Sequence, residues 1–164
     1  MKGSYSLIIK APEEAEVGAL GLKKFESDYV VYNGSAFGPG GLKRVFRHFS
    51  SDNKIHWHID YLLEKGTLEV ALIFPDKDLE CSLSQKMDAP VDKFGSSDCG
   101  CNSHLFQFSS FEAAFQKISS VVSDVKVMDK YRYQQYKNSE DQYSKDDVLR
   151  DLPGAEAYKK SGNL

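Results

Sequence analysis

A strand, a glycine-rich turn and a basic helix follow one another in the first third of the chain, and this order constrains the fold more than any other feature. Residues 28–32 (DYVVY) are rich in β-branched and aromatic side chains, which is typical of a strand. The Gly-Pro-Gly-Gly run at 38–41 interrupts the chain, and a short amphipathic helix is expected at 42–50. In that helix Arg44 and His48 are four residues apart and share a face. With the tyrosine at the strand end, they form a set that suits a phosphodiester, because it offers a cation and groups that transfer protons.

Hydrophobic patterning in the rest of the chain predicts a mixture of strands and helices. Strands are expected at 4–9, 28–32 and 67–74, and the first two pair as an antiparallel hairpin with a long connection through 11–24. Further helices are expected at 54–63, 79–87 and 110–124, with a short strand at 104–108.

The composition changes near residue 126, which divides the chain into a domain at 1–125 and a Tyr-rich, charged C-terminal extension at 126–164. Aliphatic residues become sparse there, and tyrosines alternate with polar and charged residues. Two readings are open, a helical arm over the domain and a partly ordered tail. Tyrosines interleaved with basic residues could also stack on nucleobases, but an amphipathic arm is the favoured interpretation.

Charge and composition limit the function classes. The net charge of −3 gives no global signature of nucleic-acid binding, so a nucleic-acid site must be local. The best candidate is the basic cluster Lys43, Arg44, Arg47 and His48, and a solvated helix face is the competing reading. No apolar run of about 18 residues predicts a membrane span, and no signal-peptide pattern follows Met1. A cytoplasmic protein with reduced thiols is expected, because its three cysteines are an odd number and Cys99 and Cys101 are close neighbours.

Two short motifs on the first two strands give the glycine turn a context. Gly3-Ser4-Tyr5 and Tyr32-Asn33-Gly34 resemble the paired Gly-Ile-Tyr and Tyr-Ile-Gly signatures of the GIY-YIG endonucleases. The segment 42–48 is similar to that family's arginine helix, and Glu80 occupies the place of its glutamate at a helix start after the third strand. The resemblance implies an α+β fold with a small antiparallel three-stranded sheet flanked by helices, here with added C-terminal strand and helices.

Several further stretches are similar to one branch of that family, the small Uri-type proteins of archaea and bacteria. These stretches are 56–62, 80–81, 94–99 and 103–106. In some organisms that domain is fused to a DNA glycosylase, which implies DNA repair and makes a glycosylase or another repair protein a candidate partner.

The chain also departs from the family pattern. Ser4 and Asn33 replace the two signature isoleucines, and neighbouring side chains in a strand point to opposite faces. We therefore expect weakened packing or a solvated back face behind the two tyrosines, with the chemistry retained. The insertion at 38–41 lengthens the spacing between tyrosine and arginine, which affects the approach angle of the helix.

The resemblance implies a role for each of five residues. Tyr32 would be the general base for the attacking water, and it needs a nearby cation because a phenol titrates near 10. Arg44 would stabilise the transition state, and Glu80 would hold Mg²⁺ or Mn²⁺. Tyr5 would orient water or phosphate, and His48 would contact phosphate or assist proton transfer. The competing reading makes the tyrosines half-buried strand residues and Glu80 an ordinary first-turn helix acid.

Two other sets of residues carry weaker signals. Substrate contacts are expected from Lys43, Arg47, His56, His58 and Asp98. Some of Cys81, Cys99, Cys101 and His104, with His56 or His58, could bind zinc, but their spacing fits no standard finger. The favoured interpretation places Cys81 in the core without zinc, and Asp60 could orient a histidine.

Two functions follow. The favoured one is a metal-dependent DNA endonuclease acting in repair or on structured or damaged DNA. The alternative is a non-catalytic nucleic-acid-binding module of the same fold, stabilised by zinc. A protein-interaction scaffold has little support beyond the tyrosine-rich extension.

Overall fold

A five-stranded antiparallel sheet forms the centre of the molecule. The structure, a computed structural model, describes residues 1–52, 54–139 and 142–164. The strand order is β6-β4-β1-β5-β7, where β1 is Gly3–Lys10, β4 is Tyr29–Ser35, β5 is Thr67–Pro75, β6 is Leu105–Phe108 and β7 is Lys126–Asp129. The α+β class is confirmed, whereas the expected three-stranded sheet is wrong, because β6 and β7 add one strand to each side of the predicted β4-β1-β5 core.

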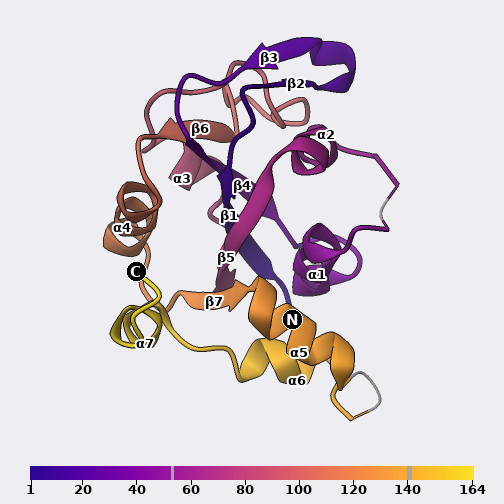
Figure 1. Cartoon of the computed structure of the whole chain (residues 1–164), viewed down its shortest axis with the longest axis vertical. Coiled ribbons are helices and arrows are strands. Elements are labelled where there is room, and N and C mark those ends of the chain that lie inside the picture. Colours follow the sequence, from indigo (N-terminus) through magenta and orange to yellow (C-terminus); the bar gives the residue numbers. More distant parts are fainter. Residues whose placement is uncertain (53, 140–141) are drawn as a thin grey trace.

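Alternation along the central strands builds a core on each face of the sheet. Leu7 and Ile9 of β1 contribute to one core, while Ile8 contributes to the other. In β5, Ala71 and Ile73 face the first core and Leu72 the second. A sheet buried on both faces requires helices on both faces, and the molecule has them (Figure 1).

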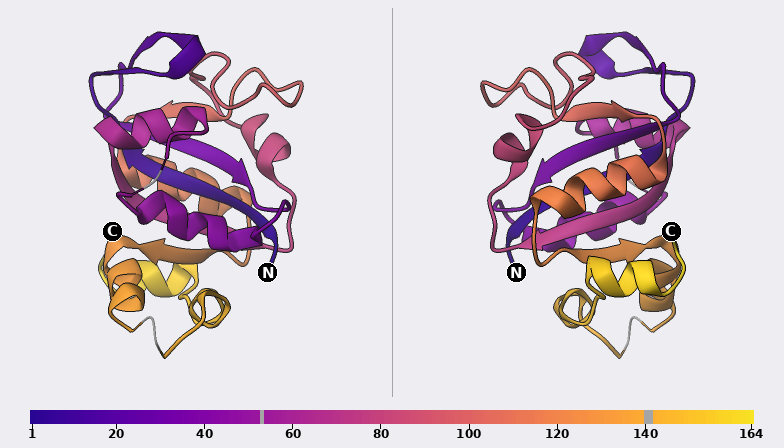
Figure 2. Two further views of the ribbon diagram at one scale, coloured as in Figure 1. Left: turned by 90° about the vertical axis from the view of Figure 1, so that its right-hand side faces the viewer. Right: turned by 90° about the vertical axis from the view of Figure 1, so that its left-hand side faces the viewer.

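The helices divide between the two faces, as the side views show (Figure 2). Residues of α1 (Arg44–Phe49), α2 (His58–Lys65), α5 (Lys130–Asn138) and α6 (Lys145–Arg150) enter the first core. Residues of α3 (Glu80–Ser84), α4 (Phe111–Val121) and α7 (Ala155–Lys160) enter the second. None of these helices, within the residues described, has the length and apolarity needed to cross a membrane.

The predicted helices form, but most are shorter than expected. The helix expected at 42–50 begins as the 3₁₀ turn η2 (Gly41–Lys43) and becomes α1. The segment before α2 is not helical, since Trp57 has extended dihedral angles. In α4 the Ser110 hydroxyl accepts a hydrogen bond from the Ala113 N–H, which caps the helix.

The segment 11–24 is more ordered than the long connection that the sequence predicts. It forms a small hairpin of β2 (Glu14–Glu16) and β3 (Leu22–Lys24), joined by the 3₁₀ turn η1 (Gly18–Leu20). The hairpin lies beyond the main sheet and contacts α2 (Figure 1).

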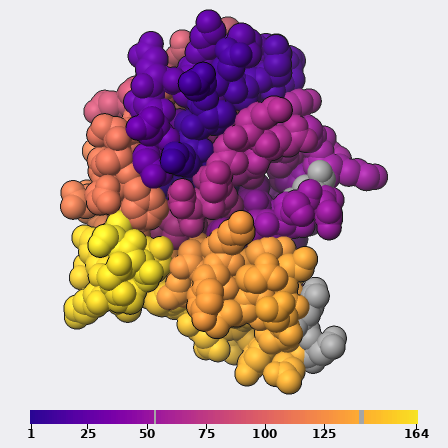
Figure 3. Space-filling view, in the orientation of Figure 1, coloured from indigo at the N-terminus to yellow at the C-terminus, as the bar shows by residue number. Residues whose placement is uncertain are grey.

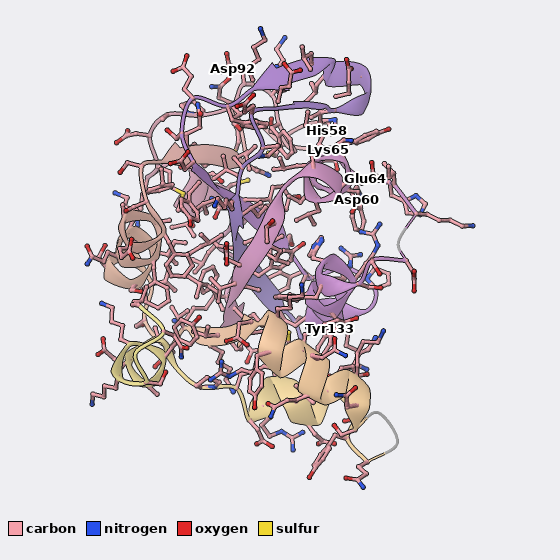
Figure 4. The ribbon with its side chains drawn as sticks, viewed as in Figure 1. His58, Asp60, Glu64, Lys65, Asp92 and Tyr133 are labelled. Carbon is pink, nitrogen blue, oxygen red and sulfur yellow. The ribbon has the colours of Figure 1, made fainter. Side chains whose placement is uncertain are left out.

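The C-terminal extension is built onto the domain. Its first element, β7, pairs with β5, and α5 packs on α1 with the Phe46 and Tyr136 ring centroids 4.8 Å apart. Figure 3 shows the extension, orange to yellow, packed directly against the rest of the chain. Tyr133 is buried at this contact (Figure 4), while Tyr131 and Tyr143 are exposed. Of the two readings, an arm over the domain describes the extension at residues 126–139 and 142–164.

Candidate functional site

A pocket of about 320 Å³ brings together four of the five residues predicted to be catalytic. Tyr5 on β1, Tyr32 on β4, Arg44 at the start of α1 and Glu80 at the start of α3 all line it. A larger hollow of about 680 Å³ lies beside α1 and α2, and none of these four residues lines it. We therefore take the smaller pocket as the candidate site.

The fifth residue, His48, lies behind Tyr5. The Tyr5 hydroxyl and His48 Nε2 are 2.8 Å apart, and both side chains are buried. Gly34 pairs with Tyr5 across β1 and β4, and a Cβ at this position would lie only 2.4 Å from Cζ of Tyr5. Gly34, the glycine of the second motif, therefore leaves room for the ring of Tyr5, the tyrosine of the first motif.

Burial shifts the pKa values of the two tyrosines, His48 and Glu80. Desolvation raises the pKa of Tyr5 well above its usual value, with Glu80 adding to the shift, and it raises the pKa of Tyr32 in the same way. Burial lowers the pKa of His48 to about 4, so its imidazole is neutral at pH 7. Burial together with Asp78 and Asp98 raises the pKa of Glu80, against a hydrogen bond with the Ser35 backbone. Burial therefore favours the neutral forms of Tyr5, Tyr32 and His48 at this site.

Arg44 supplies positive charge at the pocket. Its Nε donates to the Pro39 carbonyl at 3.1 Å, and its guanidinium carbon is 5.7 Å from the centre of the Trp57 ring. The inserted glycine-rich turn at 38–41 therefore holds the arginine through a backbone carbonyl. Trp57 is 44% exposed and also lines the pocket.

The residues predicted to contact substrate separate into two groups. His56, His58 and Asp98 line the pocket. Arg47 and Lys43 do not line it. Arg47 donates to both carboxylate oxygens of Asp60 at 3.0 and 2.9 Å, and Lys43 lies 3.3 Å from Asp146 of the extension.

Asp60 joins α1 to the segment that carries Trp57. Besides Arg47, it accepts hydrogen bonds from the backbone N–H groups of His56 and Trp57 at 2.9 and 2.8 Å. The expectation that Asp60 orients a histidine ring is wrong, because its oxygens bind a guanidinium and the backbone. Figure 4 shows Asp60 on α2, on the side that faces α1.

The back face of the two motif strands is buried and polar, which corrects the expected solvated face. Asn33 is 1% exposed, and its amide accepts from the Ser6 hydroxyl at 2.7 Å and donates to the Ser84 hydroxyl at 3.1 Å. The Ser4 hydroxyl donates to the Lys77 carbonyl and accepts from the Leu79 N–H. The two polar replacements therefore tie α3, and with it Glu80, to the sheet.

A second cluster of side chains adjoins the pocket. Cys81 on α3 and Cys99, Cys101 and His104 on the following loop place one ligand atom each within 4.8 Å of one another. Cys81 is only partly buried and belongs to this cluster, so its predicted place in the core is wrong. These four residues could hold a metal ion.

Trp57 was missed as a site residue by sequence reasoning. Its ring lies 4.6 Å from the guanidinium carbon of Arg47 and faces Arg44 as well. The only signal was the position of the chain's single tryptophan between His56 and His58 in a polar segment. Paired arginines on one exposed indole are favourable cation–π contacts and form a flat rim beside the pocket.

Comparison with known proteins gives a family but no function. No curated protein and no solved structure matches the chain. A family model described as "Domain of unknown function DUF123" matches residues 4–127. The match runs from the first residues of β1 into β7, and so includes every residue that lines the pocket. The chain therefore belongs to the family of the domain of unknown function DUF123.

Proposed function

We propose that the chain is a divalent-metal-dependent endonuclease that hydrolyses phosphodiester bonds in DNA. The observation that carries this proposal is the convergence of Tyr5, Tyr32, Arg44 and Glu80 on one pocket from four separate elements. The resemblance to the GIY-YIG endonucleases, Uri-type branch, supports it, since the same four residues carry that resemblance.

The pocket fits a hard divalent cation. Mg²⁺ prefers oxygen ligands and often uses only one or two protein carboxylates. Glu80 would hold the ion, and Asp98 is a second carboxylate in the lining. Burial, with the negative charges of Asp78 and Asp98, raises the pKa of Glu80, and a cation bound beside the carboxylate would oppose that rise. Bound there, Mg²⁺ or Mn²⁺ would neutralise charge on the phosphate and assist the leaving oxygen.

The protein side chains would position the phosphate and move the proton. Arg44 would bind the phosphate oxygens and stabilise the charge that develops on them. Tyr32 would orient the attacking water and, once ionised to the phenolate beside a bound cation, would accept the proton of that water and return to the neutral phenol. Tyr5 would hold water or phosphate, while its hydroxyl is hydrogen-bonded from behind to Nε2 of the neutral His48 imidazole. His48 would act through Tyr5, since it does not line the pocket.

The surroundings of the pocket favour a narrow range of DNA substrates. Trp57 offers a face on which an unpaired base can stack next to Arg44, and a net charge of −3 gives little general attraction for duplex DNA. This proposal fits nicked, flapped or damaged DNA in the cytoplasm as the substrate. A glycosylase or another repair protein would be the partner.

Cleavage assays with paired variants test the proposal. Duplex, nicked, flapped and base-damaged DNA are incubated with Mg²⁺, Mn²⁺ or EDTA. Arg44→Ala should reduce the cleavage rate by about 10²–10³-fold, the usual effect of removing one such group, and Glu80→Gln should abolish metal-dependent cutting. Arg150→Ala and Glu112→Gln are the controls, since Arg150 is exposed and Glu112 is an exposed first-turn acid on α4.

Two results would reject the nuclease. One is a wild type that cuts no substrate with any metal, and the other is cutting by both site variants at the rate of the controls. A wild type that binds these DNAs without cutting would establish the alternative, a nucleic-acid-binding module.

A further inference from the structure

We propose that Cys81, Cys99, Cys101 and His104 bind one structural zinc ion that fastens the 94–104 loop to α3. Three thiolates and an imidazole form one of the common donor sets of structural zinc sites. The sequence spacing fits no standard finger, because the first ligand comes from a helix and the other three from a loop that folds back on it.

The distances between the donors match a tetrahedral ion. With Zn–S of about 2.3 Å and Zn–N of about 2.0 Å, tetrahedral geometry separates the donor atoms by about 3.5–3.8 Å. The Sγ of Cys99 is 3.3 Å from Nε2 of His104, and the Sγ of Cys81 is 3.9 Å from the same nitrogen. All four donors lie within 4.8 Å of one another, so no pair has to close by more than about 1 Å to reach the tetrahedral separation.

His104 points to an ion more specifically than the thiols do. It is 2% exposed, and its Nε2 lies 3.9 Å from the Sγ of Cys81 and 3.3 Å from the Sγ of Cys99. Its other nitrogen, Nδ1, lies 3.8 Å from a carboxylate oxygen of Glu80. Histidines that bind metals usually present their second nitrogen to a carboxylate or carbonyl, which sets the tautomer. A small rotation of Glu80 gives that arrangement here.

The competing explanations account for the cluster less well. All three thiols are only partly buried, so tight packing does not explain why they gather. A disulfide would use two of the three and leave the third thiol beside a buried imidazole. A zinc ion uses all four groups.

The zinc ion would hold one wall of the candidate active site, and this part of the inference rests on the proposed function. Gly95, Ser97 and Asp98 of the loop line the pocket. The Gly95 N–H donates to Nδ1 of His58 at 2.9 Å. Since Cys81 directly follows Glu80, the same ion would also fix the first turn of α3, from which Glu80 enters the pocket.

Metal analysis of the full-length protein tests the site without any activity assay. Protein purified without chelators should contain about one zinc per chain, measured by mass spectrometry of the metal. Cys99→Ser and Cys101→Ser should lower the zinc content at least tenfold. Ser82→Ala, an exposed neighbour of Cys81, is the matched control and should retain it.

Cobalt titration of the wild type tests the site even when the cysteine variants fail to fold. Co²⁺ added to the zinc-depleted wild type should produce thiolate charge-transfer bands and the strong visible bands of a tetrahedral site. Absence of both zinc and these bands overturns the proposal. So does zinc that persists in both cysteine variants, or a disulfide among the three cysteines in the freshly purified protein. A protein that binds zinc in this way but cuts no DNA would reject only the proposed nuclease.

Discussion

The Arg47–Asp60 ion pair should be among the largest single contributions of a polar contact to stability. The Asp60 side chain is 6% exposed and receives four hydrogen bonds, two from Arg47 and two from the backbone N–H groups of His56 and Trp57. Asp60→Ala removes all four hydrogen bonds and leaves the guanidinium without its partner carboxylate.

The expected loss of unfolding free energy is about 3 kcal/mol. Breaking a buried ion pair by removing one partner costs about 3–5 kcal/mol, and the lower end applies because Arg47 keeps 22% of its side chain exposed. For a chain of this length each 1 kcal/mol changes the Tm by about 2–4 °C, so the melting temperature should fall by about 6–12 °C.

Thermal and urea denaturation of five proteins measures this effect. These are the wild type, Asp60→Ala, Arg47→Ala and the double variant, with Glu64→Ala as an exposed control on the same helix (Figure 4). The coupling free energy of the pair should be about 1–3 kcal/mol. A loss below about 1 kcal/mol for Asp60→Ala, or additive losses in the double variant, would refute the reasoning.

The same pair has a pH signature. Burial alone would raise the pKa of Asp60, but hydrogen bonds from Arg47 and the backbone outweigh it and lower the pKa. A carboxylate with a depressed folded pKa stabilises the fold above its unfolded pKa of about 4, and this stabilisation disappears as the pH falls below it. Acid unfolding of Asp60→Asn should therefore depend less on pH than that of the wild type.

Two further predictions concern the Tyr5 pair. Gly34→Ala should displace the Tyr5 ring, since the new methyl would lie 2.4 Å from Cζ of Tyr5. A crystal structure of the variant, or its fluorescence and activity, would report the displacement. An unmoved Tyr5 would contradict the prediction. His48, whose pKa falls on burial from 6.5 to about 4, should make the fold progressively less stable as the pH is lowered through that interval, because the unfolded chain binds the proton first. Melting of wild type and His48→Gln between pH 7 and 4 measures this, and equal slopes for the two proteins would disprove it.

The central strands were predictable because local pattern alone defines them. The segment at 4–9 alternates and then runs apolar, the segment at 67–74 is apolar and β-branched, and both became central strands. By contrast, β7 has only four residues, KVMD, and its pairing with β5 depends on the intervening chain. A short edge strand carries too little periodicity to be distinguished from a loop.

The parts of the site that depend on long-range packing were not predictable. The burial of Asn33 is stabilised by Ser84, which lies 51 residues away on α3. Likewise, Cys81 reaches His104 only because α3 packs beside the loop that ends in β6. The tyrosines, Arg44 and Glu80 were named from motifs, whereas the polar contacts that orient α3 require the folded sheet.

The pairing of β7 with β5 also determines where the chain can be shortened. The strand β5 has nine residues, six of its side chains are apolar, and on one side it pairs with β1. A fragment that ends at residue 125 would leave the other side open, with a row of unpaired N–H and C=O groups available to another copy. Such an apolar edge is a template for aggregation between chains. The C-terminal extension thus protects this edge by pairing β7 with β5. Any truncation intended for crystallisation or NMR should therefore retain Lys126–Asp129.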